Sequence, residues 1–334
     1  MTCSSCSLTA SFSQFFTSRR SRGRDMSCPT LLLSNPRKHA TLRLSKVSGH
    51  TTELLEIQSD KPTFHVLFIP GNPGVVSFYK DFLESLYELL GGSASVTAIG
   101  HISHTEKNWE HGKLFSLQDQ IDHKVDFIKQ ELQNNELPIV LVGHSIGSYI
   151  SLEILRFLEK VTYLIGLYPF LMLNPLSKQQ SNIENVAESS ILSALLSFSV
   201  ASLGLLPQCT LRFILSKSLG SSWSDTAIDA ACSHLLQYHT FRNMLYMALM
   251  EFRKLSEMPD WAFMRENHEK IAFLFGVDDH WGPLQMFEEI SKQVPGISLS
   301  IEREGHTHSF CCTEAGSEWV AHHVASLIKK KISS

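Results

Sequence analysis

The sequence lacks the excess of positive charge that nucleic-acid-binding domains usually carry. Its 29 Lys and Arg residues are outnumbered by 33 Asp and Glu residues, and the formal net charge is -4 at pH 7. We therefore expect no nucleic-acid partner. The seven cysteines provide no disulfide framework, because only Cys3 and Cys6 have Cys-x-x-Cys spacing and no second pair follows. Such an odd, scattered set is typical of a reducing compartment.

The chain also lacks the compact apolar run of a secretory signal. Residues 1–40 are instead rich in Ser and Thr, and their only acid is Asp25. Their basic residues are Arg19, Arg20, Arg22, Arg24, Arg37 and Lys38. This composition resembles an organelle transit peptide, which would direct the protein to a plastid or mitochondrion, and it fits a disordered extension equally well.

From residue 41 onward, apolar strand-like runs alternate with amphipathic helical segments. The predicted strands are residues 63–69, 95–101, 138–143, 161–167, 270–276 and 297–301. The predicted helices are residues 77–90, 117–132, 146–158, 284–294 and 314–330. This alternation predicts an α/β fold with a mostly parallel, doubly wound sheet. It lapses at residues 169–268, so we expect a helical cap inserted into a core made of residues 41–168 and 269–334.

The strongest chemical signal is the segment Gly143-His144-Ser145-Ile146-Gly147. It has the pattern G-x-S-x-G, follows an apolar strand and precedes a helical segment. A sharp strand-to-helix turn of this kind presents a serine hydroxyl above the sheet, where it can act as a nucleophile. The arrangement predicts an α/β-hydrolase fold with Ser145 as its nucleophile.

A serine hydroxyl needs a base, and the base needs an acid to orient it. In this fold the chain order is Ser, acid, His. Asp278 and Asp279 follow a predicted strand, and the position three residues after a glycine favours Asp279. His306 and His308 follow the last predicted strand and are both candidates for the base, and His280 is a further candidate that lies very near the acid in sequence. No third ligand accompanies this His-x-His pair with suitable spacing, so we predict no metal site.

An oxyanion hole needs backbone N–H groups directed at the developing negative charge. One donor should be the N–H of Ile146, directly after the nucleophile. The second normally comes from the loop after the first core strand, here Pro70-Gly71-Asn72-Pro73-Gly74. Pro73 has no N–H, so Asn72 is the expected donor.

These motifs together resemble the lipid droplet-associated hydrolase family. The matching segments are residues 68–74, residues 143–147, Asp279-His280-Trp281 with Pro283, and His308-Ser309-Phe310. The family usually has Ala where this chain has Ser309. The resemblance implies an α/β-hydrolase fold, droplet association and a role in neutral-lipid storage or turnover. It also implies that Ser145 is the nucleophile, Asp279 the acid and His308 the base.

A lipid surface is also suggested by residues 189–211, which contain no charged side chain. The segment holds six serines and is only modestly apolar, so a cap helix that dips into a lipid monolayer is favoured. A cap helix packed only on the catalytic core is the second alternative, and a transmembrane span is the least favoured. The leading hypothesis is an esterase or lipase acting on apolar acyl esters, without cofactor or metal. Acyl transfer to another alcohol and a non-catalytic droplet scaffold are the alternatives.

Overall fold

The computed structural model describes residues 38–132, 136–219 and 222–333. Residues 1–37, which form most of the predicted N-terminal extension, lie outside them. Eight strands form one sheet in the order β1-β2-β4-β3-β5-β6-β7-β8. The strands are β1 (Thr41–Val47), β2 (His50–Ile57), β3 (Phe64–Ile69), β4 (Ala94–Ile99), β5 (Ile139–His144), β6 (Val161–Leu167), β7 (Ile271–Gly276) and β8 (Ser298–Glu302). From β4 to β8 all neighbouring strands are parallel, which confirms the predicted α/β sheet.

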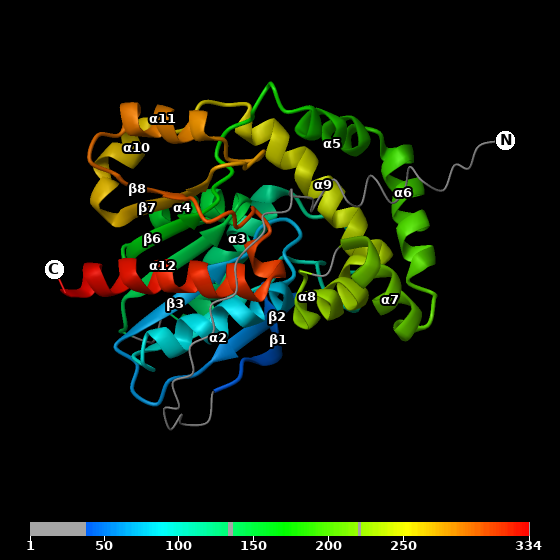
Figure 1. Cartoon of the computed structure of the whole chain (residues 1–334), viewed down its shortest axis with the longest axis horizontal. Coiled ribbons are helices and arrows are strands. Elements are labelled where there is room, and N and C mark those ends of the chain that lie inside the picture. Colours follow the sequence, from blue (N-terminus) through cyan, green and yellow to red (C-terminus); the bar gives the residue numbers. More distant parts are fainter. Residues whose placement is uncertain (1–37, 133–135, 220–221, 334) are drawn as a thin grey trace.

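The helices of the core cover both faces of this sheet (Figure 1). They are α2 (Lys80–Leu89), α3 (Leu117–Phe127), α4 (Ile146–Phe157), α11 (Leu284–Gln293) and α12 (Glu314–Ser333). Val66 and Phe68 of β3 pack on the face covered by α2 and α12, whereas Leu67 and Ile69 pack on the face covered by α3, α4 and α11. Successive strand residues point to opposite faces. The central strands are therefore apolar at almost every position, as the sequence predicted.

Strands β1 and β2 were not predicted. They form an antiparallel hairpin at one edge of the sheet, and β2 pairs with β4 in antiparallel orientation. The hairpin turn contains only Ser48 and Gly49, and both have positive φ, 49° and 84°. Two-residue turns with positive φ at both positions match the twist of antiparallel strands.

Between β6 and β7 the chain forms a helical cap (Figure 1). Its helices are α5 (Lys178–Glu188), α6 (Ser190–Leu203), α7 (Gln208–Leu219), α8 (Asp225–Ala230), α9 (Tyr238–Leu255) and α10 (Trp261–Glu266). The long helix α9 contacts both α5 and α6. Its buried residues follow helical spacing, with Met244, Ala248 and Leu255 on one stripe, so α9 packs the cap on the core; α8 also contacts the core, at residues 76–79 and 310–312.

Within the described ranges, no single helix has the length and apolar character needed to cross a membrane. The pair α5 and α6 passes such a test together by length and composition, but the two helices meet at an angle of 99°.

Candidate active site

Ser145 lies at the turn between β5 and α4 and has φ 54° and ψ -123°. This left-handed conformation is strained for a residue with a side chain. The turn is possible because its neighbours are small: a Cβ on Gly147 would lie 2.3 Å from the carbonyl oxygen of Ile69. A Cβ on Gly143 would lie 2.3 Å from the carbonyl oxygen of Gly147. The two glycines of the motif are therefore required by close backbone packing.

Asp279 and His308 form a partly buried hydrogen bond in the same pocket region. His308 Nδ1 donates to Asp279 Oδ2 over 2.9 Å, and Asp279 Oδ1 accepts the backbone N–H of Trp281 over 2.9 Å. The Asp279 carboxylate thus holds the imidazole in one orientation, and the other ring nitrogen of His308 remains available as a base. Ser145 and His308 line the same pocket, although no hydrogen bond joins the serine hydroxyl to the imidazole among the described residues.

The neighbouring candidates lie elsewhere. Asp278 and His280 are exposed. The ring of His306 packs against Trp319, with ring centroids 5.8 Å apart. Of the alternatives left open by the sequence, the geometry therefore brings Asp279 and His308 together and leaves Asp278 and His306 apart.

The two expected oxyanion donors come from two different segments of the chain. Ile146 is the first residue of α4, so its N–H has no acceptor within the helix. Asn72 lies in the loop after β3 and lines the pocket that contains Ser145. Its side chain faces the cap, where Asn72 Nδ2 donates to the carbonyl oxygen of Met244 over 2.9 Å and to Glu251 Oε1 over 3.0 Å.

A hydrogen-bonded chain that the sequence did not predict joins the loops of the site. The backbone N–H of Gly71 donates to Tyr79 Oη over 3.1 Å, and Tyr79 Oη lies 2.8 Å from His144 Nδ1. His144 Nε2 lies 2.9 Å from the backbone oxygen of His308. Burial lowers the pKa of His144 well below its usual range, and the nearby His308 lowers it further. His144 is therefore neutral at pH 7 and can both accept and donate.

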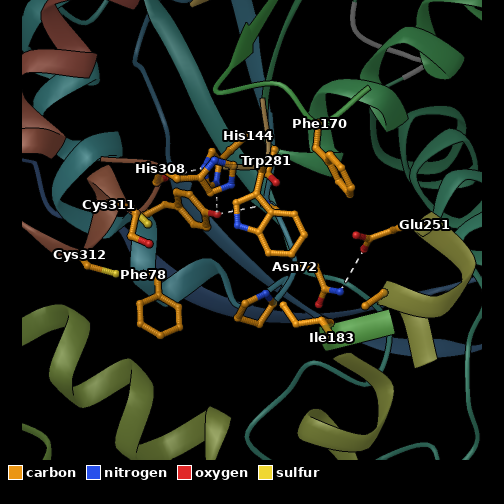
Figure 2. A pocket seen from close by; sticks show the side chains of 16 residues that line it. Asn72, Phe78, His144, Phe170, Ile183, Glu251, Trp281, His308, Cys311 and Cys312 are labelled. Carbon is orange, nitrogen blue, oxygen red and sulfur yellow. Dashed lines mark hydrogen bonds between the residues drawn. The ribbon is translucent and has the colours of Figure 1, made fainter. Parts of the chain in front are cut away.

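Core and cap both contribute to the pocket around Ser145 (Figure 2). Its apolar lining includes Phe78 and Trp281 from the core, Phe170 just after β6, Ile183 of α5 and Ala248 of α9. Such a lining suits an apolar group, such as an acyl chain, next to the serine hydroxyl. No group of three or more metal-ligating side chains occurs in the part of the chain that the structure describes.

Glu251 is a further polar group of this pocket that the sequence analysis missed. It is 3% exposed, and burial raises its pKa to about 8, while its hydrogen bond with Asn72 acts in the opposite direction. The available signal was its position on the apolar stripe of α9, three residues after Ala248 and four before Leu255. A carboxyl group at such a position is buried when the helix packs.

Comparisons with known proteins agree with this fold. A model of the family described as lipid-droplet associated hydrolase matches residues 62–311. The chain is 28% identical over 283 residues to a lipid droplet-associated hydrolase of Dictyostelium discoideum, covering 79% of this chain and 88% of that protein. It is 27% identical over 281 residues to the human protein of the same name, covering 78% of this chain and 84% of that protein.

Solved structures with the same fold include haloalkane dehalogenase DbeA from Bradyrhizobium elkani, with a TM-score of 0.66 and 15% identity. That match covers 88% of this chain and 99% of the dehalogenase. A soluble variant of monoglyceride lipase from Saccharomyces cerevisiae matches with a TM-score of 0.60 and 12% identity over 92% of this chain and 99% of the lipase. These likenesses confirm the predicted α/β-hydrolase fold. Because the family model covers most of the folded part, the chain belongs to the lipid droplet-associated hydrolase family.

Proposed function

We propose that this protein is a serine hydrolase of the esterase or lipase type that acts on apolar acyl esters at the lipid droplet surface. The observation that carries this proposal is the pairing of His308 with Asp279 at 2.9 Å in the pocket that also holds Ser145 in its strained turn. Serine, acid and histidine follow one another along the chain in the order of the α/β-hydrolase triad.

In the proposed reaction, His308 Nε2 takes the proton of the Ser145 hydroxyl as its oxygen attacks the ester carbonyl. The negative charge on the tetrahedral intermediate is stabilised by the backbone N–H groups of Asn72 and Ile146. His308 then returns the proton to the leaving alcohol, and an acyl ester of Ser145 remains. Water, deprotonated by His308, attacks this acyl ester, and His308 then returns the proton to the Ser145 oxygen as the carboxylic acid leaves. Asp279 stabilises the imidazolium that forms in each half of the reaction.

An exposed apolar surface supports the lipid droplet as the site of action. Helix α6, the turn after it and α7 expose large apolar side chains, among them Ile191, Leu195, Phe198, Leu205 and Phe213. No charged residue interrupts residues 189–211. In Figure 1, α6 forms the outer edge of the cap, remote from the core helices. A droplet has a single phospholipid layer over oil, so shallow insertion of such a surface is sufficient for binding.

The names of the relatives support the same location, because they are called lipid droplet-associated hydrolases. The plastid alternative, which depends on residues 1–37 outside the described structure, has no support among these relatives. We therefore propose the lipid droplet surface as the place where the protein meets its substrate.

Hydrolysis by wild type and Ser145→Ala of triacylglycerols, sterol esters and short-chain esters tests the proposed activity. We expect wild type to release acid from at least one ester class and Ser145→Ala to lose this activity. Ser298→Ala, which changes an exposed serine of β8, is the matched control and should retain it. Equal hydrolysis by wild type and Ser145→Ala would overturn the proposal, and inactivity of both would favour a scaffold.

A further inference from the structure

Glu251 places a carboxyl group in the substrate pocket, and the mechanism above does not use it. The side chain extends from α9, and its carboxyl group points toward Trp281 and Asn72 (Figure 2). Among the described residues its one hydrogen-bond partner is Asn72, whose Nδ2 lies 3.0 Å from Glu251 Oε1. The second carboxyl oxygen, Oε2, therefore keeps its hydrogen-bonding capacity.

The surroundings of Glu251 favour its neutral, protonated form. The described residues that line the pocket include no Lys or Arg, and their other ionisable groups are Tyr79, His144, His308, Cys311 and Cys312. Burial without a cationic partner disfavours the charged carboxylate. The pKa of Glu251 is accordingly raised to about 8. Below this pH the Glu251 carboxyl carries a proton that it can donate.

Asn72 supplies the complementary group. Its Nδ2 donates both to the carbonyl oxygen of Met244 and to Glu251, so the orientation of the amide is fixed by two acceptors. Asn72 Oδ1 is buried and has no hydrogen-bond partner among the described residues. Buried polar atoms are rarely left unpaired in folded proteins, and such an atom in a pocket is commonly satisfied by a ligand or water.

A hydroxyl group would pair with both residues at once, because it can accept a hydrogen bond from Glu251 and donate one to Asn72 Oδ1. We infer that Glu251 and Asn72 together bind a free hydroxyl group of the substrate, so that the enzyme prefers partially acylated alcohols such as diacylglycerols. Triacylglycerols and sterol esters carry no free hydroxyl. The inference rests on the proposed function and narrows its substrate class.

The position of Asn72 also indicates where this hydroxyl lies. The backbone N–H of Asn72 is the proposed donor to the ester carbonyl. The Asn72 side chain belongs to the same residue, so it should contact the substrate near the reacting carbonyl. The hydroxyl should therefore lie on the alcohol part of the ester, near the scissile bond. A site built to hydrogen-bond a substrate hydroxyl discriminates strongly against an analogue without it, because its own polar groups are then left unpaired.

The test compares two substrates that differ only in this hydroxyl: 1,2-dioleoylglycerol and 1,2-propanediol dioleate, in which a hydrogen atom replaces the hydroxyl, in detergent micelles with the full-length protein. We expect wild type to have a kcat/KM at least about tenfold higher for the diacylglycerol. Glu251→Leu should reduce this ratio to near one. Glu251→Gln should keep most of it, because its amide accepts from Asn72 and donates to the hydroxyl. The control Glu257→Gln changes an exposed carboxyl just beyond α9 and should keep the wild-type ratio.

Equal rates of wild type on the two substrates, in enzyme whose Ser145 is labelled by a fluorophosphonate, would overturn this inference and leave the proposed hydrolase intact. An unchanged ratio in Glu251→Leu would also overturn it. Absence of both hydrolysis and labelling in wild type would overturn the proposed function and the inference together. Partial unfolding of a variant lowers its rates on both substrates but not the ratio of the two kcat/KM values. If Glu251→Leu fails to fold, the comparison of the two substrates with wild type still decides the inference.

Discussion

Tyr79 Oη lies 2.8 Å from His144 Nδ1, and this contact connects three segments of the candidate active site. The direction of each hydrogen bond follows from its neighbours. The carbonyl oxygen of His308 can only accept, so His144 Nε2 carries the proton and donates over 2.9 Å. His144 Nδ1 then accepts from Tyr79, whose hydroxyl oxygen accepts the N–H of Gly71. The loop before Asn72, the residue before Ser145 and the backbone of His308 are thereby held together.

Removal of the Tyr79 hydroxyl should reduce turnover more than substrate binding. Tyr79→Phe leaves the N–H of Gly71 and His144 Nδ1 without partners, which costs about 1–3 kcal/mol of unfolding free energy. We expect kcat to fall about tenfold with a smaller change in KM, because the hydroxyl is engaged by Gly71 and His144 and so positions the catalytic loops. Tyr163→Phe on β6 is the control for loss of a tyrosine hydroxyl. Equal kinetics in Tyr79→Phe and wild type would contradict a positioning role.

Asp279 and Asp278 offer a matched pair of adjacent carboxylates. Asp279 is buried against His308, whereas Asp278 is exposed. Asp279→Asn should lower kcat by about 10³–10⁴-fold, because an amide does not stabilise the imidazolium and can reverse the tautomer. Asp278→Asn should change kcat by less than about twofold, because the Asp278 carboxylate is exposed. The measurement is steady-state hydrolysis of the best ester by both variants; comparable losses in the two would refute the assignment of the acid.

Glu251 should make stability depend on pH. Its pKa is raised from 4.5 to about 8 in the folded protein, so between these values the folded state binds more protons than the unfolded state. The contribution of Glu251 to the free energy of unfolding therefore decreases as pH rises from about 4.5 to about 8. Each pKa unit corresponds to about 1.4 kcal/mol, so the total effect is on the order of a few kcal/mol.

Glu251→Gln isolates this contribution because it cannot ionise. Urea denaturation measures the free energy of unfolding of both proteins. As pH rises from 5 to 8, we expect this free energy to fall in wild type relative to Glu251→Gln. Other titrating groups, such as the buried His101 and His104, are present in both proteins and largely cancel in the difference. A difference that does not vary with pH would show that Glu251 has an ordinary pKa.

The exposed apolar face of α6 should be needed for droplet binding. Leu195→Glu with Phe198→Glu places two charges on side chains that are 60% and 62% exposed. Because both side chains are exposed, we expect folding to persist, but the fraction of protein that floats with isolated droplets should fall about tenfold or more. Ile332→Glu changes an exposed residue at the end of α12, remote from α6 in Figure 1, and should float like wild type. Undiminished flotation of the double variant would contradict this role.

The parts of the fold that could be predicted are those with a local signal. Strands such as β5 and β7 are uninterrupted apolar runs, and the turn at Ser145 is recognisable because glycines are required at fixed positions. The hairpin of β1 and β2 gave a weaker signal, because β1 lies at the sheet edge and mixes polar and apolar residues. The hairpin joins the sheet because β2 pairs with β4, and most of the paired residues are more than forty positions apart in the chain.

The missed site residues depend on contacts between distant segments. Tyr79 gains its role from Gly71 and His144, and Glu251 gains its role only when α9 packs over the loop of Asn72. The apolar stripe of α9 indicates that Glu251 is buried, but no pattern within α9 shows that its carboxyl group meets Asn72. The choice between His306 and His308 was likewise open until the structure paired His308 with Asp279.

The most direct test of the central claim is to locate the covalent adduct of a fluorophosphonate with the full-length protein by peptide mass spectrometry. Our account predicts one adduct on Ser145, with labelling slowed strongly in Asp279→Asn and absent in Ser145→Ala. An adduct on another residue, or labelling of Ser145→Ala as fast as wild type, would contradict the assignment of Ser145 as the nucleophile.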